Sequence, residues 1–183
     1  MFYKYTCLKL MLRCILLLSC IYNGSVLARI STDHTRLTVE GNILDTPCSI
    51  DPGSKEQTIW MGATPTELIK RNGVGGVVPF VVKLNDCTLQ RLDRRLADWQ
   101  GFTITMNGVS EGNDFAVSGN ASGVSLRILD TDGKRVVPGK SLPKEQLVQG
   151  DQTLNFSLQL VANHKPLLKG NFRAVVRFGI TYF

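Results

Sequence analysis

The C-terminal segment, residues 170–183, constrains the fold more than any other part of the chain. Its apolar side chains recur at every second position, at Ala174, Val176, Phe178, Ile180 and Tyr182, and Phe183 follows them. This period of two predicts a β-strand with one buried face. Chain ends usually fray and carry polar residues. An apolar pattern that continues to the last residue therefore predicts that another element covers this strand.

The first 28 residues have the features of a secretory signal peptide. An apolar core over residues 15–21 follows the basic residues Lys4, Lys9 and Arg13. Signal peptidase cleavage is predicted after Ala28. A transmembrane helix needs about 20 apolar residues, and polar residues 22–25 interrupt this core too early. A lipoprotein signal, with Cys20 as the lipid acceptor, is the alternative interpretation.

Removal of the signal peptide changes the charge of the chain. The formal net charge falls from +6 to +3, because three basic residues and no acidic residue are lost. This small excess, without a basic run among aromatic residues, does not favour nucleic-acid binding. The remaining 155 residues are enough to form one domain with its own core.

Two of the five cysteines remain after signal removal, Cys48 and Cys87. An even pair in an oxidising compartment predicts a disulfide. A metal site is a poor alternative, because two thiolates without a neighbouring histidine do not make a good zinc site. The histidines, His34 and His164, lie in polar or turn segments.

The body of the chain consists of short segments rich in Val, Ile, Thr and Phe, separated by turn sequences. Strands are predicted over residues 37–50, 57–61, 77–84, 102–109, 124–129, 153–161 and 172–183. This pattern predicts an all-β fold, a β-sandwich with immunoglobulin-like architecture.

One segment departs from the strand pattern. Apolar residues recur at helical spacing, and basic residues lie between them: Leu89, Leu92, Leu96 and Trp99, with Arg91, Arg94 and Arg95. This spacing predicts a short amphipathic helix across one end of the sandwich. A binding patch is the alternative. Residues 64–68 predict a further helical turn, with a proline at its start.

The sequence gives little support for catalysis. A nucleophile needs a base within hydrogen-bonding reach, and that base is most often histidine. Both histidines are interpreted as solvated loop residues. No phosphate-binding loop is present, and the carboxylates are scattered near turns. We therefore expect that the chain is not an enzyme and has no cofactor.

Four segments together point to a known family. They are residues 41–50 with Cys48, residues 59–62 with 80–87 and Cys87, residues 123–133, and the end of the chain, where Gly170 is fourteenth from the last residue and Tyr182 is penultimate. In this order they resemble pilus subunits of the bacterial chaperone–usher pathway, including the minor subunits of P-type pili.

The resemblance implies an incomplete immunoglobulin-like sandwich, which lacks its last strand and is completed by a donated one. A periplasmic chaperone would fill a groove beside the C-terminal strand. At the outer-membrane usher, the extension of a neighbouring subunit would replace it. The chaperone would bind Gly170, Ala174, Val176, Phe178, Ile180, Tyr182 and Phe183. The chain would thus be exported through the periplasm to the cell-surface pilus.

The resemblance also implies a division of the mature chain. Residues 29–42 would form the donated N-terminal extension, and residues 43–183 the pilin domain. The apolar face of the extension would be Thr35, Leu37, Val39, Gly41 and Ile43. An ordinary first strand of the sandwich is the alternative interpretation of this alternation.

The length of the mature chain leaves no room for a second, receptor-binding domain. A minor rod or adaptor subunit and a base terminator are the remaining roles. The alternative outside the family is a single-domain secreted adhesin or periplasmic binding module. That alternative predicts a stable monomer, whereas an incomplete sandwich should be unstable without a partner.

Overall fold

The computed structural model describes residues 37–41, 43 and 45–183. The predictions for the signal peptide, its cleavage after Ala28 and the first donor residue, Thr35, lie outside these residues. The chain divides into two compact units, residues 1–42 and 43–183. In the first unit, residues 37–41 are exposed and have no regular secondary structure. The second unit contains all the elements that follow.

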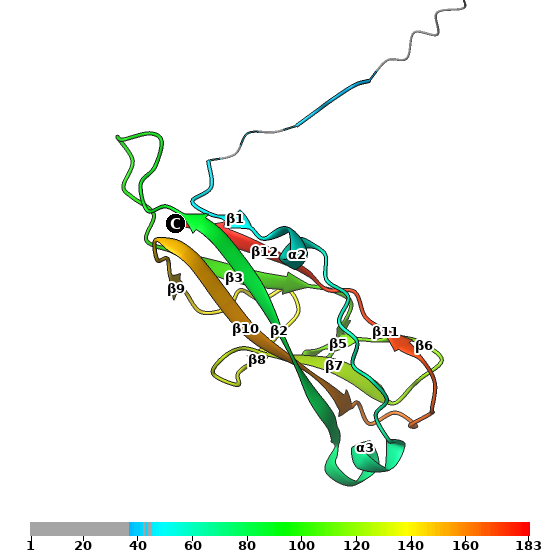
Figure 1. Ribbon diagram of the computed structural model, residues 1–183. Helices are drawn as coiled ribbons and strands as arrows, with labels where there is room; N and C mark the ends of the chain where they lie inside the picture. Colours follow the sequence, from blue (N-terminus) through cyan, green and yellow to red (C-terminus); the bar gives the residue numbers. More distant parts are fainter. Residues whose placement is uncertain (1–36, 42, 44) are drawn as a thin grey trace, which may run out of the picture. The chain divides into compact units, whose positions relative to one another are not determined.

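A large antiparallel sheet forms the main layer of the second unit (Figure 1). Two long strands, β2 (Val74–Cys87) and β10 (Gly150–Ala162), pair along most of their length. The remaining strands follow in the order β1-β2-β10-β7-β5-β4, and β8 pairs with β7. Their bounds are β1 Ser49–Ile50, β4 Ser110–Glu111, β5 Asp114–Ala116, β7 Val124–Leu129 and β8 Arg135–Val136.

A smaller sheet holds the C-terminal strand. Its order is β12-β3-β9, with bounds β3 Gly101–Asn107, β9 Glu145–Gln146 and β12 Arg177–Tyr182. A third pair joins β6 (Ser118–Gly119) to β11 (Phe172–Arg173). Two short helices, α2 (Pro52–Lys55) and α3 (Thr66–Asn72), lie between β1 and β2 in the sequence. The all-β class expected from the sequence is confirmed.

The core lies between the inward-facing side chains of these sheets. β3 contributes Phe102, Ile104 and Met106, which alternate with partly exposed residues as a strand with one buried face requires. β2 and β10 contribute Val82, Leu84, Phe156 and Leu158 to the same cluster. A smaller cluster around Ile69, Val124 and Leu160 lies against α3.

The predicted helix over residues 89–99 is wrong. The segment forms a turn-rich loop, in which Leu92 is 85% exposed and Leu96 is 51% exposed. The Trp99 N–H donates to the Leu89 carbonyl at 2.7 Å, so the loop closes on itself at its base. Trp99 is buried, and the Arg91 guanidinium stacks 3.4 Å from its ring centroid. The helical spacing of the leucines therefore does not produce a buried helix face.

Gly123 is a position where the fold requires glycine. Its φ is +82°, and an added Cβ would lie 2.6 Å from Leu167 Cα and 2.7 Å from the Pro166 carbonyl oxygen. We expect Gly123→Ala to lower the free energy of unfolding by about 2–4 kcal/mol, through left-handed strain and overpacking. Gly133 is the matched control, because its φ is +74° but no atom lies within 4 Å of an added Cβ. Urea unfolding of the two variants should show that Gly133→Ala costs only about 1–2 kcal/mol. Equal losses would contradict the packing argument.

Candidate strand-binding site

β12 is an edge strand. It pairs antiparallel with β3, placing Phe178 opposite Met106, Ile180 opposite Ile104 and Tyr182 opposite Phe102. Within the described residues, no strand pairs with the other edge of β12. One side of this strand is thus available to a further strand.

Burial differs sharply across the pairing of β12 with β3. Phe102, Ile104 and Met106 are 0%, 3% and 2% exposed, whereas their partners on β12 are only half-buried. The two sets of side chains belong to the same face of the same sheet, and both pack against the core. The core is therefore well covered at β3 and incompletely covered at β12.

The pairing of β12 with β3 determines which backbone N–H and C=O groups of β12 are left without a partner. The Phe183 N–H donates to the Gly101 carbonyl at 3.0 Å, and the Gly101 N–H donates to the Phe183 oxygen at 3.3 Å. In an antiparallel ladder such pairs alternate with pairs whose backbone groups point outward. The backbone groups of Phe178, Ile180 and Tyr182 consequently point away from β3. The residues that face the core are thus also the residues that offer free hydrogen-bonding groups.

The segment over residues 57–61, which the sequence predicted as a strand, is not one. It has no strand partner in the described part of the chain. The alternation typical of a strand is nevertheless present, because Ile59 and Met61 pack against the core while Trp60 is 86% exposed. The Gln57 side chain holds the segment to β2 by donating to the Val81 carbonyl at 2.8 Å. It is therefore a second extended element that contributes apolar side chains without strand hydrogen bonds.

Aromatic contacts fix the end of β12. The Tyr182 ring meets the Trp99 ring edge-on at 6.2 Å and the Phe102 ring at 6.0 Å. Burial raises the pKa of the Tyr182 phenol, because desolvation disfavours its anion. The Lys144 ammonium lies 4.5 Å from the Phe183 ring centroid. The end of the strand is thus held in place while its outer edge remains open.

The other predicted site residues lie in the segment that leads to β12 and in the N-terminal extension. Ala174 and Val176 precede β12, are half-buried and pack against the core. Gly170 passes close to another backbone, since an added Cβ would lie 2.5 Å from the Asn120 carbonyl carbon. The described donor-face residues Leu37, Val39, Gly41 and Ile43 are exposed.

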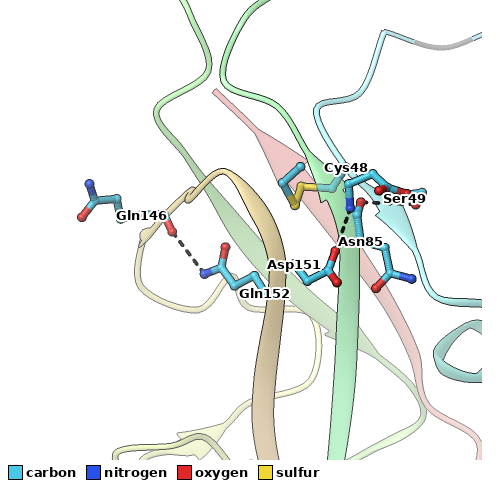
Figure 2. Close-up of a disulfide and its surroundings, with 8 residues drawn as sticks. Cys48, Ser49, Asn85, Gln146, Asp151 and Gln152 are labelled. Carbon is cyan, nitrogen blue, oxygen red and sulfur yellow. Dashed lines mark hydrogen bonds between the residues drawn. A yellow bond between two sulfur atoms is a disulfide. The ribbon is translucent and has the colours of Figure 1, made fainter.

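The disulfide predicted between Cys48 and Cys87 is present. It joins the residue before β1 to the end of β2, as Figure 2 shows. Hydrogen bonds surround it: the Ser49 hydroxyl donates to the Asn85 carbonyl at 3.2 Å, and the Thr88 N–H donates to the Pro47 carbonyl at 2.8 Å. This junction fixes where the domain begins relative to β2.

Two further kinds of site are absent from the described residues. No group of three or more His, Cys, Asp or Glu side chains there could hold a metal ion. No helix in the same residues is long and apolar enough to cross a membrane.

Comparison with known proteins supports the same fold. The family model described as "Fimbrial protein" matches residues 37–182. The Major MR/P fimbria protein of Proteus mirabilis (strain HI4320) is 29% identical over 160 residues, covering 87% of this chain and 89% of that protein. The PRS fimbrial minor pilin protein of Escherichia coli is 29% identical over 149 residues, covering 80% and 76%. The crystal structure of the P pilus rod subunit PapA superposes with a TM-score of 0.66 at 20% identity, covering 75% of this chain and 100% of that one. The predicted immunoglobulin-like sandwich is thereby confirmed.

Proposed function

Because the chain belongs to the fimbrial protein family, we propose that β12 is the edge at which it receives a strand from its partners. The chain is a structural subunit of a cell-surface pilus of the chaperone–usher type, and its family is not one of enzymes. It assembles with neighbouring subunits.

The open edge of β12 carries the proposal. Phe178, Ile180 and Tyr182 offer half-buried side chains and outward backbone groups at the same positions. An added strand would satisfy the backbone groups and cover the apolar surface with its alternate side chains. Peptide recognition by strand addition works in this way, and donor-strand complementation of pilins is itself a known instance of it. Left open, such an edge promotes aggregation.

A periplasmic chaperone is the proposed first donor. The N-terminal extension of a neighbouring subunit, delivered at the outer-membrane usher, is the proposed second. This chain has such an extension, in which Leu37 and Val39 alternate with Thr38 and Glu40. Their exposure in the described residues is compatible with donation to another subunit.

We further propose that the chain is a minor subunit, either an adaptor within the pilus or a terminator at its base. The relatives include both major and minor subunits at the same 29% identity, so this role rests on the sequence resemblance. An adaptor exchanges the chaperone strand for another subunit's extension. A terminator keeps it.

Periplasmic expression of residues 29–183, with and without a pilus chaperone, tests the proposal. We expect soluble chain only with the chaperone, as a one-to-one complex. A synthetic peptide with the N-terminal extension of another pilin, added to this complex, then separates the roles: displacement of the chaperone indicates an adaptor, and refusal indicates a terminator. A stable, cooperatively folded monomer without chaperone would instead support the single-domain adhesin or binding module.

A further inference from the structure

A second open edge lies on β10, where this strand extends beyond its neighbour β7. The pairing between the two strands begins at Ser157 opposite Leu129, so residues 152–156 of β10 have β2 on one side only. A segment that includes Leu142 and Glu145 borders a cavity of about 340 Å³ with this part of β10. The cavity is distinct from the edge of β12.

The backbone of this part of β10 points into the open side. Thr153 pairs with Lys83 and Asn155 with Val81, and both β2 carbonyls accept hydrogen bonds from groups outside β10. The backbone groups of Thr153 and Asn155 therefore point away from β2. The Thr131 hydroxyl donates to the Asn155 carbonyl at 3.0 Å, which agrees with this direction. Within the described residues, the Thr153 N–H, the Thr153 carbonyl and the Asn155 N–H have no hydrogen-bond partner.

The cavity beside this edge combines an apolar floor with an acceptor-rich rim. Ile104, Leu142, Leu154 and Phe156 supply apolar side chains. The carboxylates at the rim are Asp130, Asp132 and Glu145, and no lining residue is basic. Lys134 pairs with Asp132 at 3.2 Å, and Asp130 accepts the backbone N–H groups of its own turn. Of the three rim carboxylates, only that of Glu145 has neither an ion pair nor a hydrogen-bond donor within the described residues.

Gln152 marks one end of the cavity. Its Nε2 donates to the Gln146 carbonyl at 3.2 Å, a bond drawn in Figure 2. Its Oε1 is buried and has no hydrogen-bond partner within the described residues. A buried acceptor without a donor is costly. A ligand that brings an N–H or ammonium group would satisfy it.

From this geometry we propose that the β10 edge binds a short extended peptide segment that carries a Lys or Arg side chain. Its backbone pairs with Thr153 and Asn155, as in strand addition to an exposed edge. Residues 152–156 span about 13 Å, which suits a strand of four to five residues. The basic side chain lies toward Glu145 and Gln152, and flanking apolar side chains cover Leu142 and Leu154. Charge complementarity selects a basic partner over an acidic one.

A capped, fluorescein-labelled pentapeptide, Val-Thr-Lys-Thr-Val, is the probe. Its first, third and fifth side chains face the cavity when it adds as a strand. The protein is the mature chain in the soluble form in which it is purified, and any chaperone present is also measured alone. As the protein concentration is raised to about 1 mM, the fluorescence anisotropy of the labelled peptide should show saturable binding. Added salt should weaken this binding.

Two protein variants, with one control, test the contact with the basic side chain and the backbone pairing separately. Glu145→Gln should weaken the binding of this peptide about tenfold, because it removes a charge-assisted contact. Asp98→Asn is the matched control, since Asp98 is exposed and does not line the cavity, and it should leave binding unchanged. Thr153→Pro removes an N–H that does not belong to the β2 ladder and should weaken binding about fivefold.

Two peptide variants keep the test decisive if Thr153→Pro fails to fold. A peptide with Glu in place of Lys, and one N-methylated on the face that pairs with β10, should each bind at least fivefold more weakly. Equal binding of the Lys and Glu peptides, or no loss on Glu145→Gln, would overturn the proposal. No saturable binding of the Lys peptide would do the same.

Discussion

Ile180→Asp is expected to lower the yield of soluble, chaperone-bound chain by more than about tenfold. Ile180 is half-buried opposite Ile104, and its backbone groups point to the open edge. An aspartate there would place a charge where a donated strand must cover apolar surface. Burial of an unpaired charge is costly enough to prevent docking. The measurement is the amount of chaperone complex recovered from the periplasm.

Thr181→Asp is the matched control, because Thr181 is adjacent, exposed and on the opposite face of β12. Its yield should remain within about twofold of the wild type, since its side chain stays in water. An Ile180→Val variant should also be recovered, because the loss of one methyl group costs only about 0.5–1.5 kcal/mol. Normal recovery of Ile180→Asp as a chaperone complex would contradict the placement of the donated strand at β12.

The strand pattern of the C-terminal segment could be predicted because side-chain alternation records burial directly. The prediction of one strand over residues 172–183 was nevertheless too simple. Phe172–Arg173 pairs with β6, whereas Arg177–Tyr182 pairs with β3, and residues 174–176 carry no strand pairing. The chain changes sheets at this point. A period of two shows which face is buried, but it does not identify the strand that supplies the hydrogen bonds.

The same limit explains the segment over residues 57–61. Ile59, Trp60 and Met61 alternate as in a strand, yet no ladder forms, because alternation requires only a core on one side. The helix expected over residues 89–99 failed for a related reason. Its leucines have helical spacing, but the loop offers no surface to cover Leu92. The open edge of β10 left no sequence signal, because it depends on where β7 ends.

Loss of the disulfide is expected to lower the free energy of unfolding by about 4 kcal/mol. Cys48 and Cys87 are separated by 39 residues, and the chain-entropy estimate for a loop of this size gives that value. Small domains have a total stability of about 5–15 kcal/mol. The double variant Cys48→Ala/Cys87→Ala removes the cross-link and little packing volume, so its effect reports mainly the closed loop.

The structure explains why this loop depends on its cross-link. Between the two cysteines, regular pairing to β2 is limited to Ser49–Ile50, and residues 57–61 have no strand partner within the described chain. Few backbone hydrogen bonds therefore replace the disulfide if it is removed. Urea unfolding of the chaperone complex, at one fixed concentration, should show the double variant and the reduced wild type with the same lowered midpoint. Ser49→Ala, which removes only the hydrogen bond to Asn85, should cost no more than about 1 kcal/mol. A double variant as stable as the oxidised wild type would mean that the segment between the cysteines is held by its apolar contacts alone.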